Sequence, residues 1–431
     1  MKKHGLLLAA LSALPLIASA GCAESENGYV YYINFKPEAD SAWQRLAADY
    51  TEQTGVPVKV VTAASGSYTG TLSSQMNKSS PPTLFIVNNS QDILNWDDYC
   101  FDLKGSRLAD MLDSDEYCIF GNNGEIKAVG YCYEAFGIIV NKELLGRAGY
   151  DISDIYNFDT LKAAAEDIHS RSGELSFDAF TSCGLDDSSA WRFTGHLANM
   201  PLFYEFRDDN VLEQPAAIKG SYLDKYRNIW DLYINNSTVS RSEITSATGN
   251  LAEEEFGSGK AVFFQNGTWE FEALTSGEKY GMEPDSLTMI PIYCGAEGEE
   301  KAGLCCGTEN YWAVNSRAGQ KNIDATIDFL CWVVSSDEGR QMMADSFGET
   351  PFKEHIESDN VFFKAASEYE DNGCCTVTWQ FRHTPNTDAW RAGIKSALTD
   401  YSCAGGSWDN VERAFIDGWA YQYKLEHCIF D

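Results

Sequence analysis

Apolar and polar positions alternate with two different periods over the first ninety residues. Three short runs of β-forming residues are separated by segments whose apolar residues recur at helical spacing. The expected elements are strands at 29–33, 56–61 and 84–87 and helices at 41–54 and 69–76. This β-α-β-α-β order predicts a parallel sheet with helices on both faces.

The first of these helices carries the strongest local signals. Its apolar stripe consists of Trp43, Leu46, Ala47 and Tyr50. Ser41 and Gln44 have the spacing of a capping box, so we expect the helix to begin at Ser41. Gly55 is the expected stop signal.

The same alternation continues to the end of the chain. Further strands are expected at 127–131, 137–142, 261–265 and 287–292, and further helices at 161–168, 222–233, 325–335, 390–398 and 411–419. About 400 residues exceed one ordinary domain, so two lobes are expected. Because no low-complexity linker separates them, the strands that cross between the lobes are expected to act as a hinge.

The N-terminus has the three regions of a secretory signal. Lys2 and Lys3 precede an apolar run at 6–17, which is too short to span a bilayer. Cys22 follows Ala20 and Gly21 as in a bacterial lipoprotein, so we expect a signal peptide at 1–21, a lipid on Cys22 and a tether at 22–28. Ordinary cleavage before a chance cysteine is the alternative. The protein would then be exported to the outer face of the cytoplasmic membrane and touch the membrane only through this lipid.

Composition excludes several classes of function. The net charge of −32 repels nucleic acid and anionic lipid. No histidine spacing suits a metal, and no G-x-S-x-G, complete phosphate loop or H-E-x-x-H is present, so we expect neither a cofactor nor a metal. Twelve cysteines follow Cys22 without a C-x-x-C; disulfides and buried thiols both remain open.

The stretch 253–271 suggests where a ligand would bind. It reads as an acidic helix end, a Gly-Ser-Gly-Lys turn, a buried strand, a second turn at Asn266 and Gly267, and then Trp269 at the start of the next helix. In open α/β sheets, ligands bind where strands end and helices begin. Trp191 and Trp379 also fall in expected turns or helix starts, so all three rings are candidates for stacking on a sugar, with core packing as the alternative.

Several segments together resemble the extracellular solute-binding proteins of family 1, the maltose-binding-protein-like receptors of bacterial carbohydrate ABC importers. They are 31–60, the "PPTLFIVN" strand, 127–142, 253–271, 303–315 and "SSDEGRQMMADSFGETPF". Thr83 stands where the family usually has Asp, and the family's Pro near Tyr133 is absent. The resemblance implies a two-lobed α/β fold of the periplasmic-binding-protein type, with a mainly parallel sheet flanked by helices in each lobe and three hinge crossovers. The crossovers are expected near 133–142, after 267 and at 303–315, with lobe 1 at 29–137 and 268–312 and lobe 2 at 138–267 and 313–431.

The resemblance also implies which residues touch the ligand. In the family the loops after the first strands touch the ligand, which points to Asn34, Phe35, Lys36, Tyr68 and Asn89. Charged groups suited to sugar hydroxyls are Lys36, Glu134, Glu309 and Arg382. With the three stacking rings, the predicted binding residues are Asn34, Phe35, Lys36, Tyr68, Asn89, Glu134, Trp191, Asn266, Trp269, Gly307, Glu309, Trp379 and Arg382. No catalytic residue is expected. The expected function is capture of a carbohydrate, an oligosaccharide, by a monomer that delivers it to ABC permease subunits. The alternatives are a receptor for a peptide, polyamine or other non-sugar solute, and an exported glycosidase that uses Glu134 and Glu309.

Overall fold

The computed structural model describes residues 27–64, 66–88, 90–277, 279–348, 350–403 and 405–429. The expected signal peptide and Cys22 lie outside these residues. Within the described part of the chain, no helix is both long and apolar enough to cross a membrane. The twelve cysteines from Cys100 to Cys428 are all free, and seven of them are buried. Their packing therefore fits small hydrophobic side chains better than a disulfide framework.

The first lobe is built on a six-stranded sheet with the order β2-β1-β3-β11-β5-β4. Its strands are β1 (Val30–Asn34), β2 (Val58–Thr62), β3 (Leu84–Val87), β4 (Cys118–Phe120), β5 (Ile126–Gly130) and β11 (Tyr311–Val314). β1 pairs in parallel with β2 and β3, as the β-α-β-α-β reading predicts. β11 arrives from the other lobe and pairs antiparallel with both β3 and β5.

Helices cover this sheet and enclose an aromatic core. They are η1 (Pro37–Ala39), α1 (Asp40–Thr54), α2 (Tyr68–Met76), α3 (Ser90–Trp96), η2 (Asp97–Tyr99), α4 (Arg107–Asp110), η3 (Asp115–Tyr117), α12 (Gln320–Ser335) and α13 (Asp337–Phe347). Trp43 of α1 is fully buried and packs near Trp312 and Phe347. Gly55 ends α1 in the left-handed region at φ +74°, as expected.

The expected capping box at Ser41 is absent. A 3₁₀ turn that begins with Pro37 leads directly into α1, which therefore starts at Asp40 with Ala39 at the N-cap. Gln44 instead donates to the Asp40 carboxylate at 3.3 Å. Proline suits the first turn because its ring presets φ and its missing N–H is not needed there.

The second lobe contains the order β12-β10-β6-β8-β7, with β9 also paired to β6. The strands are β6 (Glu134–Asn141), β7 (Asp178–Phe180), β8 (Ala261–Gly267), β9 (Leu287–Ile290), β10 (Ala302–Gly307) and β12 (Cys375–Thr378). β6 is antiparallel to β8, β9 and β10, whereas β7–β8 and β10–β12 are parallel. Pairing in both sheets is therefore more mixed than the expected mainly parallel arrangement, because β6 and β11 each enter through a short connection from the other lobe.

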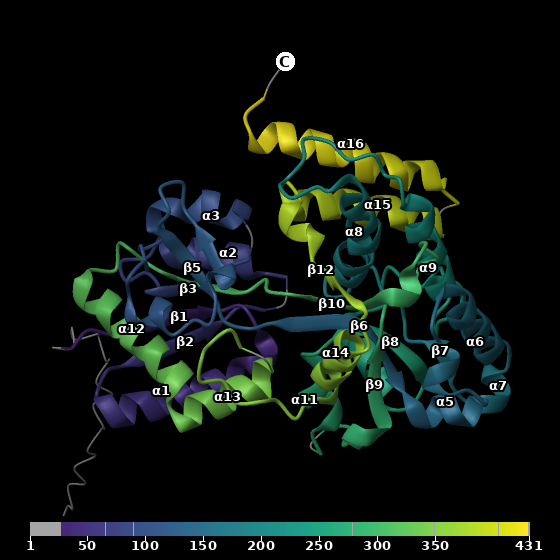
Figure 1. The fold of residues 1–431 in the computed structure, drawn as a ribbon, viewed down its shortest axis with the longest axis horizontal. Helices are drawn as coiled ribbons and strands as arrows, with labels where there is room; N and C mark the ends of the chain where they lie inside the picture. The colour runs from purple at the N-terminus through teal and green to yellow at the C-terminus, as the bar shows by residue number, and fades with distance from the viewer. Residues whose placement is uncertain are drawn as a thin grey trace, which may run out of the picture.

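Helices cover both faces of the second sheet. They are α5 (Lys142–Ala148), η4 (Ile152–Asp154), α6 (Phe158–Ser170), α7 (Ser172–Leu175), the π-helix η5 (Arg192–Leu197), α8 (Ala198–Asp209), α9 (Leu223–Asn235), α10 (Gly249–Gly257), α11 (Glu270–Thr275), η6 (Pro284–Ser286), η7 (Glu299–Lys301), α14 (Val361–Asp371), η8 (Gln380–His383), α15 (Thr387–Cys403) and α16 (Trp408–Glu426). Phe136 and Ile138 of β6 belong to one apolar cluster, and Ala135 and Ile139 belong to the cluster on the opposite face. Figure 1 shows the two lobes side by side, with α1, α12 and α13 on one side and α5, α6 and α9 on the other.

Three segments connect the lobes. They are 131–133 between β5 and β6, 308–310 between β10 and β11, and 348–360 between α13 and α14. The first two are bonded to each other, since Tyr131 N–H donates to the Asn310 carbonyl at 3.2 Å and the Thr308 hydroxyl donates to the Cys132 carbonyl at 2.6 Å.

The observed lobes differ from the expected division of the chain. β9 and β10 belong to the second sheet, although 268–312 was expected in lobe 1. α12 and α13 contribute to the core of the first lobe, although 313–431 was expected in lobe 2. The expected crossover after 267 does not occur, because Leu274 of α11 packs in the same cluster as β8. The local pattern of a strand followed by a helix does not reveal which core the helix joins.

Candidate ligand-binding site

A buried ion pair joins the two lobes at the carboxyl end of β1. Asn34 ends this strand, and its side chain accepts a hydrogen bond from Lys36 N–H at 3.1 Å and donates to the Lys36 carbonyl at 2.6 Å. This local bonding fixes the turn that directs Lys36 toward the second lobe. Lys36 Nζ lies 2.8 Å from Oε1 of Glu134, the first residue of β6, and these side chains are only 7% and 3% exposed.

The pair is charged despite its burial. Burial acts to lower the pKa of Lys36, but the carboxylates of Glu134 and Glu38 outweigh it and the pKa is raised. The second oxygen of Glu134 accepts from Asn310 Nδ2 at 3.4 Å. Lys36 Nζ also lies 5.6 Å from the centre of the Trp269 ring, within range of a cation–π interaction.

Aromatic side chains of the second lobe gather beside this pair. Trp191 and Trp269 are both partly exposed, and their ring centres lie 5.9 Å apart. Trp269 Nε1 donates to Asn266 Oδ1 at 2.8 Å, and Asn266 Nδ2 donates to Glu270 at 2.6 Å, which fixes the orientation of the indole. Trp269 belongs to the second lobe, because no crossover follows β8; Lys36 of the first lobe nevertheless approaches it.

The first lobe contributes Phe35 and Tyr68. Their rings meet edge to face with centres 5.2 Å apart, and Phe35 is partly exposed. The Tyr68 hydroxyl is already bonded to the backbone N–H and carbonyl of Ile86, so only its ring is free to contact a ligand. On the rim, a Cβ added to Gly66 would lie 3.9 Å from the Asp187 carbonyl, so the lobes nearly touch there.

Acidic groups surround the junction. Glu309 lies on the 308–310 connection, and burial raises its pKa to about 7; Arg391 and Lys36 act in the opposite direction, while Glu134 and Asp388 raise it further. Burial likewise raises the pKa of Glu270 to about 8, with a contribution from Glu253. Both carboxyls are therefore partly protonated near neutral pH and can donate as well as accept hydrogen bonds.

Four of the predicted binding residues have a different status. Trp379 is 4% exposed; it packs against Phe136, and its Nε1 donates to the Cys305 carbonyl at 2.9 Å. It is a core residue of the second lobe and not the stacking ring that its position in the sequence suggested. A Cβ on Gly307 would lie 2.8 Å from the Trp379 ring, so this glycine makes room for the core. Asn89 and the side chain of Arg382 lie outside the described part.

The structure adds two residues that the sequence did not indicate. His196 of the π-helix η5 stacks on Phe136 and contacts the two exposed tryptophans. Arg391 of α15 donates to Thr194 at 3.4 Å and influences Glu309. Neither belongs to a recognisable spacing, because tertiary packing alone brings them to this place.

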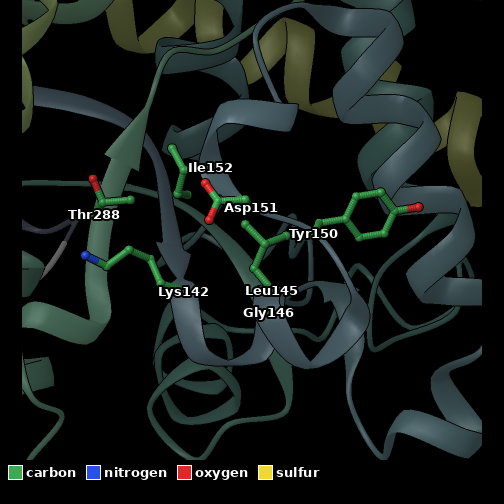
Figure 2. Close-up of a pocket in the computed structure, with 7 residues that line it drawn as sticks. All are labelled: Lys142, Leu145, Gly146, Tyr150, Asp151, Ile152 and Thr288. Atoms are coloured by element: carbon green, nitrogen blue, oxygen red, sulfur yellow. The ribbon is translucent and has the colours of Figure 1, made fainter.

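Two hollows of the second lobe lie away from the junction, and no predicted binding residue in the described part of the chain lines either of them. Among the described residues, no three histidine, cysteine or acidic side chains gather to hold a metal ion. A hollow of about 330 Å³ lies on the second lobe, lined by Lys142, Leu145, Gly146, Tyr150, Asp151, Ile152 and Thr288 (Figure 2). In Figure 2 the Tyr150 ring points away from Asp151. None of the predicted binding residues lines this hollow.

Two α/β lobes joined by three short connections, with polar and aromatic groups where they meet, define the class of hinged solute receptors. Residues 45–371, more than half of the chain, match the family model of bacterial extracellular solute-binding proteins, and the chain belongs to this family. No curated protein sequence matches it.

Solved structures share the fold. The solute-binding protein RafE in complex with raffinose has a TM-score of 0.71 at 17% identity, with 92% of this chain and 99% of that chain covered. The GacH receptor of Streptomyces glaucescens, solved unliganded and with acarbose, has a TM-score of 0.67 at 18% identity, with coverage of 94% and 99%. A sugar transporter from Bacillus licheniformis in complex with stachyose has a TM-score of 0.67 at 15% identity, with coverage of 91% and 100%. The likeness extends over nearly the whole length of each chain, and at these identities it concerns the fold.

Proposed function

We propose that this protein is the carbohydrate receptor of an ABC importer and that it binds an oligosaccharide between its lobes. The observation that carries the proposal is the combination of a buried interlobe ion pair, Lys36 with Glu134, and two partly exposed tryptophans beside it. Sugars present apolar C–H faces and hydroxyl edges, which suit flat rings and charged hydrogen-bonding groups. Structurally similar receptors are described with raffinose, acarbose and stachyose, which supports the ligand class.

The energy of binding requires more than one ring. Micromolar affinity corresponds to about −8 kcal/mol. One indole face of about 100 Å² contributes about 2 kcal/mol before entropic costs. Trp191 and Trp269 together with hydrogen bonds to Lys36, Glu309 and Asn266 would supply the rest. A receptor that closes over its ligand gains these contacts from both lobes at once.

The direct test is binding of a panel of mono- and oligosaccharides, first by thermal shift and then by calorimetry. Trp269→Ala should lower the affinity for the best ligand by about tenfold or more, since the contact of one ring face with the ligand is lost. Trp332→Ala is the matched control, because Trp332 lies on α12 and packs against Tyr50 in the first lobe. Equal affinity of the wild type and Trp269→Ala would refute the assignment of Trp269, and stabilisation only by peptides or polyamines would refute the sugar.

Further parts of the proposal concern the setting of the receptor. The protein acts as a monomer without catalysis: Glu134 is neutralised by Lys36, and oligosaccharides should remain uncleaved after incubation.

The protein is exported, carries a lipid on Cys22, and delivers its ligand to permease subunits at the outer face of the cytoplasmic membrane. Cys22→Ser should move the protein from the membrane fraction to the soluble fraction. Retention of the variant in the membrane fraction would contradict the lipid anchor.

A further inference from the structure

A column of rings runs from the core of the second lobe to the candidate site. Trp379 stacks near Phe136 with ring centres 5.5 Å apart, and Phe136 stacks on His196 at 3.8 Å with the planes 3° from parallel. His196 then meets Trp191 edge to face at 4.9 Å and Trp269 at 5.6 Å. It is only 6% exposed and therefore links the buried core to the two partly exposed tryptophans.

An unusual backbone turn brings His196 to this place. Residues Arg192–Leu197 form a π-helical turn directly before α8, and Trp191 precedes it. A π-turn contains one more residue than an α-turn, which rotates the following side chains by about 100° relative to a regular helix. Such turns are uncommon and occur frequently at functional sites.

The side chain of Gln265 contacts the His196 ring. Gln265 Nε2 lies 3.1 Å from Nδ1 of the imidazole. With its NH₂ facing the ring, the amide donates, and this contact fits a neutral ring in which Nδ1 accepts and Nε2 carries the proton. A doubly protonated ring would lose this acceptor and place two donors face to face.

The charges around His196 also favour the neutral ring. Burial lowers its pKa, and the guanidinium groups of Arg391 on α15 and Arg192 on its own helix lower it further. Arg192 is 2% exposed and donates to the Ser189 hydroxyl and to the carbonyls of Ser182 and Gln265. The carboxyl groups of the candidate site have other partners: Glu134 pairs with Lys36, Glu270 accepts from Asn266, and Glu309 interacts with Arg391.

We propose that His196 is a positioning residue whose uncharged ring supports Trp191 and Trp269 as a flat wall of the candidate site, and that protonation of His196 dismantles this wall. A charged ring would be a third cation beside two guanidinium groups, and separation of the charges would displace the tryptophans that rest on it. The effect on ligand binding rests on the proposed function as a carbohydrate receptor. The protonation state and the packing of the His196 ring do not depend on that function.

The first experiment uses the unliganded full chain. Nitrogen-15 labelling of histidine, with His196→Gln to identify the signal, should reveal a neutral ring that is protonated at Nε2 near neutral pH and that titrates below the ordinary value of about 6.5. Titration near the ordinary value of about 6.5, or a proton on Nδ1, would overturn the assignment.

The second experiment separates ring packing from hydrogen bonding. His196→Phe retains the stacked ring and should bind the best carbohydrate within about threefold of the wild type, whereas His196→Gln should lose about tenfold or more. His427→Gln, at an exposed histidine beyond α16, is the matched control and should bind like the wild type. Unchanged affinity of His196→Gln would refute the positioning role; a large loss in His196→Phe with an unchanged melting temperature would refute the role of the ring.

A pH series completes the test. The ratio of wild-type to His196→Phe affinity should stay constant while the wild-type ring is neutral and should fall at the more acid pH where the labelling experiment shows the ring becoming charged. The ratio cancels the titration of Glu309 and Glu270, which both proteins share. A ratio that stays constant through the pH range in which the labelled ring titrates would contradict the switch. If the wild type binds no carbohydrate at all, the proposed function fails, while the labelling experiment still decides the role of His196.

Discussion

At the scale of single residues, Lys36 and Glu134 concentrate opposite charges where water hardly reaches. Their side chains are almost fully buried, and the only other contacts to the Glu134 carboxylate among described side chains are the weaker ones from Asn310 and Cys132. A buried pair of this kind contributes little relative to an apolar pair of the same shape, but loss of one partner is costly.

Replacement of Lys36 alone should therefore destabilise the fold much more than replacement of both Lys36 and Glu134. Lys36→Met should lower the free energy of unfolding by about 3 to 5 kcal/mol, since Glu134 would stay buried without its cation. The double variant Lys36→Met, Glu134→Leu should recover most of this loss. Chemical denaturation measures both. Arg107→Met, which breaks the exposed pair with Asp328, should cost less than about 1 kcal/mol; an equal cost for Arg107→Met and Lys36→Met would contradict the argument.

Glu309 makes stability depend on pH in a defined direction. Its pKa is raised from the ordinary 4.5 to about 7 in the folded protein. Below about pH 4.5 the carboxyl is protonated in both states and costs nothing; as the pH rises to about 7, the unfolded state ionises first and the folded state loses stability. Glu309→Gln removes this loss.

The variant should gain stability relative to the wild type between about pH 4.5 and about pH 7 and keep that gain at higher pH. Thermal melting at a series of pH values measures the difference. Glu174→Gln, at an exposed position on α7, is the control and should leave the pH profile unchanged. If the difference in melting temperature between Glu309→Gln and the wild type is the same at pH 4 and pH 8, the effect does not come from ionisation of Glu309.

At the scale of elements, the connection between α13 and α14 begins with a glycine whose conformation and surroundings disfavour any side chain. Gly348 ends α13 at φ +67°, and a Cβ there would lie 1.6 Å from the Phe363 ring of α14. The end of a first-lobe helix thereby packs directly on a second-lobe helix. Asn360 closes the same connection: it caps α14 and donates to the Thr268 carbonyl at 2.9 Å.

Gly348→Ala should lower the free energy of unfolding by about 2 to 4 kcal/mol, because backbone strain adds to the overlap with Phe363. Gly55→Ala is the matched control: Gly55 also follows a first-lobe helix at positive φ, but a Cβ there meets nothing within 4 Å. Its cost should be about 1 kcal/mol, from backbone conformation alone. Chemical denaturation of both variants measures the two losses of stability. Similar losses would contradict a steric contribution from Phe363.

At the scale of the whole molecule, the lobes approach each other at the rim as well as at the ion pair. Gly66 of the first lobe lies close to Asp187 of the second. Since a ligand that touches both lobes shifts the population toward the closed arrangement, this rim contact should become more frequent when the ligand is bound.

A cross-link across the rim tests this motion. Gly66→Cys with Asp187→Cys, in a background with the exposed Cys375, Cys403 and Cys428 replaced by Ser, should form a disulfide under mild oxidation, faster with ligand present than without. Gly66→Cys alone is the control and should form no internal cross-link. A rate that does not respond to a ligand of measured affinity would exclude closure at this rim. The cross-linked protein should release a bound ligand far more slowly.

The sequence by itself determined the local elements and the class of protein. The strand at the N-terminus, the stripe on α1 with its stop at Gly55, and β3 all follow from side-chain period and turn residues, because these act over a few residues. Lys36, Glu134 and Trp269 could also be named in advance as candidates, since Lys36 and Trp269 follow strands closely and Glu134 begins one.

Only the tertiary structure decided which lobe each later segment joins and which tryptophan faces the junction. β9 and β10 pair with β6 across more than 140 residues of chain, and Trp269 and Trp379 differ in exposure although both precede short helices. Such choices depend on which apolar faces meet in three dimensions. The spacing of residues along the chain does not encode those contacts. For the same reason, the role of His196 could be inferred only from the structure, in which Phe136, Gln265 and the two arginines surround its ring.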